Sequence, residues 1–246
     1  MIYYRQLHPF EAISFDLDDT LYDNSQHMPV AEAAFLHELQ QRYPATAQLA
    51  RHDWQNHRRA SLQTRPQLSN DMGRLRRDIL QRVFTSLGFE AEALKRAVDE
   101  GYACYYYHRS NLQVEENIHS LLAKLTERYK LVAITNGNVD LKQIGLADYF
   151  SHIFKAHVAM PMKPHQAMFD ACQSALNIAP QRILHVGDNL HNDIYGAMRA
   201  GFQSGWYAHD RHMQINKEPM FLLPNVQLHQ LDELLCFDHL NRINVS

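Results

Sequence analysis

From residue 112 onward, short apolar runs alternate with segments whose apolar residues recur at helical spacing. The apolar runs predict β-strands over residues 131–134, 152–158, 182–186 and 203–208, with an edge strand over 226–228. The segments between them predict helices over residues 115–128, 139–149, 165–176 and 194–200. Strands that alternate with helices indicate βαβ units and a parallel sheet. This part of the chain is therefore predicted to have an α/β fold.

One more apolar run, residues 12–16, predicts another strand of the same sheet, but it lies far upstream. Between the two parts, residues 23–111 show helical patterns only. These patterns predict helices over 30–39 and 90–108, and a weaker one over 50–65. A further helix is predicted to begin at a cap residue, Asn70 or Asp71, and its apolar face ends at Leu87. We predict a Rossmann-like, doubly wound core formed by residues 1–22 and 112–246. An inserted all-helical cap domain, residues 23–111, would act as its lid.

Composition and charge narrow the function classes. The 246 residues are 46% hydrophobic, which suffices for a large core, and the net charge of −3 implies no basic surface for nucleic acid. The cysteines Cys104, Cys172 and Cys236 show neither a disulfide framework nor a zinc-binding spacing. No signal-peptide pattern and no run long enough for a bilayer are present. We expect a cytoplasmic protein that binds neither nucleic acid nor membrane, and the oligomeric state is not predicted.

Polar clusters follow three of the predicted strands. They are Asp16 with Asp18 and Asp19, Thr135 with Asn136, and Asp188 with Asp193. Parallel strands bring their carboxyl ends to one edge of the sheet, and Lys163 lies in a loop expected at the same edge. Crowded carboxylates favour a hard cation such as Mg2+. These groups are the parts of phosphoryl transfer, although the first acidic cluster alone is also compatible with a polar turn.

These clusters resemble the four motifs of the haloacid dehalogenase-like hydrolases. The motifs are Asp16-Leu17-Asp18-Asp19-Thr20, Ile134-Thr135-Asn136-Gly137, Lys163-Pro164, and Gly187-Asp188 through Asp193. Their order and the helical insertion extend the resemblance over nearly the whole chain, which makes it specific. Met162 stands where the family often has a small residue, so the departure from the family pattern concerns the local shape of the loop and not the reach of Lys163.

The resemblance implies catalytic and metal-binding roles for three aspartates. Asp16 would be the nucleophile that forms an aspartyl-phosphate, and Asp18 would act as general acid and then as general base. Mg2+ would be held by Asp16, by the backbone carbonyl of Asp18 and by Asp188. Asp19 is assigned a structural role only.

The resemblance also implies roles around the phosphoryl group. Thr135, the backbone N–H of Asn136, and Lys163 would bind phosphoryl oxygens, and Asp193 would orient Lys163 or a metal-bound water. Each residue has a structural alternative. Thr135 and Asn136 could cap a following helix, Lys163 could be a solvated loop lysine, and Asp193 could be a helix N-cap.

Asp18 decides the expected reaction class. Family members that cleave carbon–halogen bonds lack this carboxylate, since halide leaves without a proton, so its presence favours hydrolysis of phosphate esters. Phosphonate-cleaving relatives need a cap lysine, and Lys95, the sole lysine of residues 23–111, lies late in a helix without a signalled apolar pocket. We therefore expect a phosphatase acting on a small phosphorylated metabolite.

The substrate is less constrained. Arg76 is a candidate substrate-binding residue, and the cluster from Tyr102 to Arg109 could stack on a flat heterocycle or pack the cap against the core. The motif sequences further resemble an enteric-bacterial branch that dephosphorylates flavin mononucleotide and 5-amino-6-(5-phospho-D-ribitylamino)uracil. Promiscuous action on sugar phosphates or nucleotides, and a non-catalytic member that binds a phosphorylated ligand or a partner protein, remain the alternatives.

Overall fold

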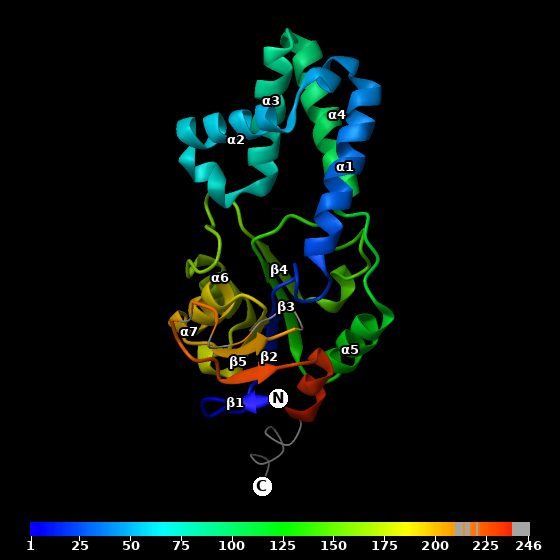
Figure 1. Ribbon diagram of the computed structural model, residues 1–246. Helices are drawn as coiled ribbons and strands as arrows, with labels where there is room; N and C mark the ends of the chain where they lie inside the picture. The colour runs from blue at the N-terminus through cyan, green and yellow to red at the C-terminus, as the bar shows by residue number, and fades with distance from the viewer. Residues whose placement is uncertain (210–213, 215–216, 220, 238–246) are drawn as a thin grey trace.

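The protein has a sheet-containing block and a purely helical block (Figure 1). The computed structural model describes residues 1–209, 214, 217–219 and 221–237. In Figure 1 the four helices α1 to α4 stand above the sheet, and all of them lie between Asn24 and Arg109. Among the described residues, no helix is long and apolar enough to cross a membrane.

A seven-stranded sheet forms the centre of the lower block, in the order β1-β7-β6-β5-β2-β3-β4. All neighbouring strands run parallel except β1 and β7. The strands are β1 (Ile2–Tyr3), β2 (Ala12–Phe15), β3 (Lys130–Thr135), β4 (His152–Lys155), β5 (Ile183–Gly187), β6 (Gln203–Tyr207) and β7 (Val226–Leu228). The predicted α/β fold with a mostly parallel sheet is confirmed.

Side chains of β2 and β3 alternate between two hydrophobic clusters, one on each face of the sheet. Ile13 and Phe15 belong to the cluster that includes Leu121 of α5 (Glu116–Thr126), whereas Ala12 belongs to the cluster around Phe169 of α6 (Ala167–Leu176). Figure 1 shows α5 on one side of the sheet and α6 and α7 (Gly196–Arg199) on the other. Strands buried on both faces explain the uninterrupted apolar runs in the sequence.

The helical block has its own core around Phe35, Leu80 and Phe84. Asp23 caps α1 by accepting a hydrogen bond from the Gln26 backbone N–H, at 2.9 Å. Its elements are α1 (Asn24–Arg42), α2 (Arg51–Thr64), α3 (Met72–Ser86) and α4 (Ala91–Arg109), with 3-10 turns η1 (Pro44–Gln48) and η2 (Pro66–Asn70). The predicted helical insertion is thus present in the structure.

Two predicted helices differ from the structure. Residues 139–149 form turns and a 3-10 turn, η3 (Ala147–Tyr149), because Gly145 has a φ of 74° and the backbone N–H groups of both Leu146 and Ala147 bond to the Leu141 carbonyl. The prediction of a helix there was wrong. Val139, Leu141, Ile144 and Leu146 are buried, but without helical backbone. The helix predicted over 194–200 begins earlier, as a π-helix, η5 (Leu190–Tyr195), that leads into α7.

The edge of the sheet also differs from the prediction. The short strand β1, which the sequence pattern did not reveal, pairs with β7, so β7 is an internal strand. The two residues of β1 are exposed, and a two-residue exposed strand has no apolar run that could signal it. The remaining short 3-10 turns are η4 (Pro180–Arg182) and η6 (Leu231–Phe237).

Candidate active site

Asp16 and Lys163 meet at the carboxyl end of the central strands. Asp16 directly follows β2, and its backbone N–H donates to the Val186 carbonyl of β5, at 2.9 Å. The Lys163 ammonium donates to Asp16 Oδ1 and to the Ile134 carbonyl, both at 2.7 Å, and lies 2.6 Å from Asp193 Oδ1. Lys163 is only 3% exposed, so it is not a solvated loop lysine.

The two carboxylates share one ammonium group, and their pKa values respond differently. Burial raises the pKa of Asp16 well above its usual range, with Lys163 opposing and Asp193 adding to the shift. Burial also acts to raise the pKa of Asp193, but Lys163 and His185 outweigh it and lower that pKa. Burial alone would lower the pKa of Lys163, whereas the two acids raise it. Asp193 is therefore the ionised partner of Lys163, and Asp16 is the carboxyl that additional positive charge would stabilise most.

A buried hydrogen-bond network holds Asp193 in place. His185 Nε2 lies 3.3 Å from Asp193 Oδ1, and His185 Nδ1 lies 2.9 Å from the Ser14 hydroxyl. An ionised carboxylate can only accept, so Nε2 donates to Asp193 and Nδ1 accepts from Ser14. Gly187 leaves the necessary space, since a Cβ there would lie 2.3 Å from Asp193 Cγ. The N-cap of η5 is Asn189 rather than Asp193, so the helix-cap alternative for Asp193 was wrong.

Thr135 and Asn136 organise the loop after β3. Thr135 Oγ1 accepts from the Gly137 backbone N–H at 2.9 Å, and as a hydroxyl it retains its own hydrogen for a further acceptor. The Asn136 side chain bonds twice to the Lys163 backbone, accepting from its N–H at 2.7 Å and donating to its carbonyl at 3.1 Å. No α-helix follows directly, so these two residues do not cap one. Asn136 instead joins the second motif to the third.

Asp18 is held by residues that the sequence analysis did not assign to the site. Its Oδ1 accepts from the Tyr22 hydroxyl at 2.7 Å and from Arg109 Nη2 at 2.5 Å. Arg109 is the last residue of α4, and its side chain is 4% exposed. Gly137 lies on the other side, where a Cβ would come within 2.3 Å of Asp18 Oδ2. The available signals were the place of Tyr22, four residues after Asp18, and an arginine at the junction of the helical block and the core.

Asp188 completes an acidic group that suits a hard cation. Carboxylate oxygens of Asp16, Asp188 and Asp193 all lie within 4.8 Å of one another. All of these ligand atoms are carboxylate oxygens, which Mg2+ prefers. A bound cation would also stabilise the ionised form of the buried Asp16 carboxylate. The residues therefore fit Mg2+. The Asp18 side chain is not in this group, which agrees with a ligand role limited to its backbone carbonyl.

Arg76 lies within the helical block, apart from these acids in the sequence and in its contacts. It donates to both Glu32 oxygens, at 3.0 and 2.8 Å, and its guanidinium carbon lies 4.1 Å from the Tyr105 ring centroid. Arg76, Tyr105 and Trp54 line a cavity of about 640 Å³ between α1, α2 and α3. The role of Arg76 in substrate binding stays a prediction.

Comparisons with known proteins identify the family. The sequence model of one protein family, described as haloacid dehalogenase-like hydrolase, matches residues 10–201. The chain is 32% identical to 5-amino-6-(5-phospho-D-ribitylamino)uracil phosphatase YigB of Escherichia coli, covering 95% of this chain and 98% of that protein. It is 26% identical to a glyceraldehyde 3-phosphate phosphatase of Pyrococcus furiosus, covering 85% of each chain.

A solved structure extends the match to three dimensions. The crystal structure of 2-haloacid dehalogenase from Pseudomonas syringae has a TM-score of 0.84 to this chain, with 28% identity and coverage of 92% of this chain and 96% of that one. Sequence and structure thus agree with the resemblance carried by the four motifs, and the chain belongs to the haloacid dehalogenase-like hydrolases.

Proposed function

We propose that this hydrolase is a Mg2+-dependent phosphatase that cleaves a small phosphate monoester through an aspartyl-phosphate on Asp16. One observation carries the proposal. The buried Asp16 carboxylate pairs with Lys163 at 2.7 Å, whereas the Asp18 carboxylate, two residues later, is held by Arg109. Two carboxylates in different environments are suited to different tasks, one as nucleophile and one as acid and base.

The reaction needs both carboxylates in sequence. An Asp16 oxygen attacks phosphorus, the bond from phosphorus to the ester oxygen breaks, and protonated Asp18 gives its proton to the leaving alkoxide. Ionised Asp18 then takes a proton from water, whose oxygen attacks phosphorus and releases Asp16 and inorganic phosphate. Tyr22 and Arg109 keep the Asp18 carboxyl in a fixed direction during both steps.

The phosphoryl oxygens would be bound by groups around Lys163. The Thr135 hydroxyl and the backbone N–H of Asn136 are the proposed donors, and the Lys163 ammonium offsets negative charge. Asn136 fixes the Lys163 backbone, while Asp193 holds its ammonium at 2.6 Å. Asp193 is therefore proposed to position Lys163 rather than to touch substrate.

Asp16, Asp188 and the Asp18 carbonyl would hold Mg2+, which supplies positive charge that lets one anion approach another. The acidic group within 4.8 Å supports this assignment. Residues 23–111 are proposed to act as the cap and residues 1–22 with 112–246 as the catalytic core, because Arg109 of the helical block reaches Asp18.

For the substrate, we propose flavin mononucleotide or 5-amino-6-(5-phospho-D-ribitylamino)uracil. The match to the Escherichia coli enzyme that carries the second of these compounds in its name, over 95% of the chain, supports this proposal. Other relatives, named as a glyceraldehyde 3-phosphate phosphatase and pyrimidine 5'-nucleotidases, support sugar phosphates and nucleotides as alternative substrates.

A dehalogenase is the second candidate, since the structural match at a TM-score of 0.84 carries that title. Halide leaves without a proton, so a dehalogenase has no use for Asp18. The bonds that Tyr22 and Arg109 make to Asp18 support the phosphatase instead.

The deciding experiment measures hydrolysis of p-nitrophenyl phosphate with Mg2+ and after chelation. The parent protein should turn over the ester only with Mg2+, and Asp16→Asn should abolish turnover. Asp170→Asn, an exposed aspartate on α6, is the matched control and should retain it. A panel of flavin mononucleotide, the ribitylaminouracil phosphate, sugar phosphates, nucleotides and 2-chloropropionate then ranks the substrates. Parental turnover by Asp16→Asn would refute the nucleophile, and absence of any ester hydrolysis would favour the non-catalytic alternative.

A further inference from the structure

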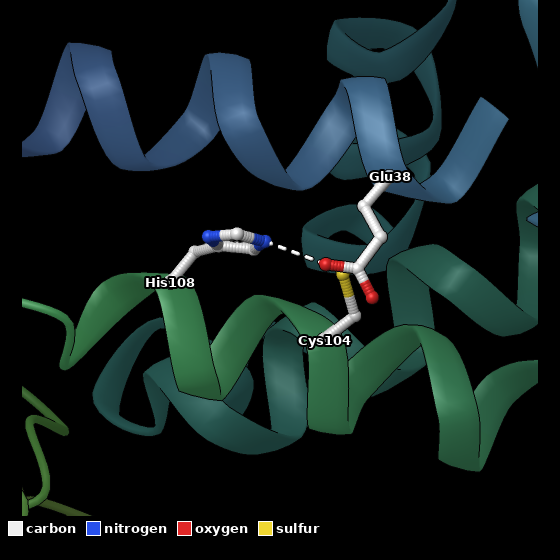
Figure 2. A group of neighbouring side chains, drawn as sticks. All are labelled: Glu38, Cys104 and His108. Atoms are coloured by element: carbon white, nitrogen blue, oxygen red, sulfur yellow. Dashed lines mark hydrogen bonds and ion pairs between the residues drawn. The ribbon is translucent and has the colours of Figure 1, made fainter. Parts of the chain in front are cut away.

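A second group of potential metal ligands lies in the helical block, between α1 and α4. Ligand atoms of Glu38, Cys104 and His108 lie within 4.8 Å of one another. Figure 2 shows Glu38 reaching down from α1 and meeting Cys104 and His108 from α4, with the three side chains pointing toward one another. His108 Nε2 lies 2.9 Å from Glu38 Oε2. This group shares no residue with the catalytic site.

The backbone fixes this arrangement. Cys104 and His108 are four residues apart on α4, so both side chains lie on one helix face. The packing of α1 against α4 through Phe35, Leu39 and Ala97 brings Glu38 opposite them. Cys104 is buried at 7% exposure, whereas the side chains of Glu38 and His108 are 39% and 16% exposed. A small ion can therefore enter from solvent and end beside the sulfur.

The three donor atoms select the class of ion. Mg2+ and Ca2+ take oxygen ligands, so a thiolate and an imidazole disfavour them. Zn2+ accepts sulfur, nitrogen and carboxylate oxygen in one tetrahedral site. Ligand atoms around a tetrahedral Zn2+ lie roughly 3.3–3.7 Å apart, as Zn–S and Zn–N bonds of about 2.3 and 2.0 Å require. Small side-chain rotations would bring these three atoms to that separation.

We propose that Glu38, Cys104 and His108 bind Zn2+, with water as the fourth ligand. The Cys104 thiol loses its proton to solvent as the zinc–sulfur bond forms, and His108 coordinates through Nε2 as the neutral imidazole. Glu38 exchanges its contact with His108 for the metal. Arg42 lies 3.4 Å from the other Glu38 oxygen, Oε1, and can retain this contact and its contact with Glu100 when zinc binds.

Zinc at this position would fasten the first and last helices of the helical block together. α1 begins at Asn24, soon after the first motif ends at Thr20, and His108 on α4 immediately precedes Arg109, which holds Asp18. A bound ion would thus fix the last turn of α4 against α1 and restrain Arg109. The sequence alone could not reveal this site, because one of its three ligands lies on a different helix.

The test uses the 246-residue chain in excess Mg2+, so that the acidic group of the proposed catalytic site is occupied. Co2+, a spectroscopic substitute for Zn2+, is titrated, and a thiolate-to-Co2+ absorption band should saturate at one equivalent and disappear when Zn2+ is added. Cys104→Ser should remove the band. His108→Gln and Glu38→Gln should weaken binding by at least about 100-fold, since even indirect partners of metal ligands cost 10–100-fold.

Cys172→Ser and Cys236→Ser are the matched controls and should keep the band. Zn2+ should also raise the melting temperature of the parent but not that of Cys104→Ser. Absence of the band in the parent, its persistence in Cys104→Ser, or its loss in a control variant would overturn the proposal. If Cys104→Ser does not fold, unchanged Co2+ affinity in His108→Gln and Glu38→Gln would overturn it equally. These readouts do not depend on phosphatase activity, so the two proposals can fail separately.

Discussion

At the scale of single residues, Asp18 links the helical block to the core. Burial, with a further contribution from Asp18, raises the pKa of Tyr22 well above its usual value, so the phenol keeps its proton and donates. Arg109 contributes a charged hydrogen bond, which is stronger than a neutral one. Its second terminal nitrogen, Nη1, is buried without a hydrogen-bond partner among the described residues. A buried donor of this kind favours an acceptor supplied by the substrate.

We therefore predict that Arg109→Gln lowers kcat/KM for phosphate esters by at least about 10-fold. The loss is expected because the Asp18 carboxyl loses its fixed direction. General acid–base catalysis contributes about 10²–10⁴-fold to the rate, and the variant should lose part of this contribution. Steady-state kinetics and the pH profile of kcat/KM are the measurements, and Arg109→Lys should recover part of the loss.

Arg77→Gln provides the control for this prediction. Arg77 pairs with Asp99 at 2.6 Å, but both side chains are about half exposed, and exposed pairs contribute little. Its kcat/KM should match that of the parent. Equal activity in folded Arg109→Gln and in the parent would contradict the positioning role.

At the scale of elements, the sequence predicted strands better than the segments after them. A doubly buried strand leaves a largely apolar run, as in β3 and, apart from His185, in β5. The polar residues Asp16, Asn136 and Asp193, which follow such runs, did converge around Lys163. Residues 139–149 carried apolar residues at helical spacing, yet Gly145 at positive φ and a return of the chain to Leu141 prevented a helix. Arg109 could not be assigned to Asp18 because a contact between distant elements leaves no periodic signal. Tyr22 lies only four residues after Asp18, but a turn connects the two, and a turn has neither helical nor strand periodicity to show where the Tyr22 side chain points.

The buried histidine of β5 gives a pH-dependent prediction. Burial lowers the pKa of His185 below the usual 6.5, despite the opposing bond to Asp193. The unfolded chain therefore binds a proton more readily than the folded protein, and the folded state loses stability as the pH falls below about 6.5. Above that pH both states carry neutral imidazole, and this contribution is constant.

Replacing His185 by Gln should remove that dependence while breaking part of the buried network. We expect a loss of about 1–3 kcal/mol in the free energy of unfolding at pH 8, because Ser14 and Asp193 lose a partner. The difference between variant and parent should then narrow as the pH is lowered from 6.5, by at most about 1.4 kcal/mol per pH unit. Urea unfolding at a series of pH values measures this, and a difference independent of pH would exclude a buried neutral His185.

At the scale of the whole molecule, the two blocks touch on two sides. On one side the end of α4 meets the core, where Gln143 donates to the Tyr107 carbonyl at 3.2 Å and Asp140 N–H donates to the Ser110 hydroxyl at 2.9 Å. On the other side, Val158 packs against the cap cluster that contains Leu68. In Figure 1 the loops after β4 rise from the core to the helices on this second side. If the helical block acts as the proposed cap, its opening would separate one of these contacts while the other serves as the hinge.

Asn70 makes the polar contact of the second side. The sequence left Asn70 and Asp71 as alternative helix caps; Asp71 caps α3, and Asn70 Oδ1 instead accepts from the Met162 backbone N–H at 3.0 Å. Met162 directly precedes Lys163, so this bond connects the position of the cap to the loop that carries the proposed phosphoryl-binding lysine. A single hydrogen bond contributes about 0.5–1.5 kcal/mol, which is enough to alter a balance between open and closed forms.

We predict that Asn70→Ala lowers kcat/KM for phosphate esters by up to about fivefold, the equivalent of about 1 kcal/mol, and speeds hydrogen exchange at the Met162 amide. Ser69→Ala is the matched control in the same turn, because its hydroxyl donates to the Pro66 carbonyl within η2 rather than to the core. Faster exchange without a change in kcat/KM would mean that this side of the cap opens independently of catalysis. Identical exchange and kinetics in the two variants would place the opening contact at the end of α4, where Arg109 meets Asp18.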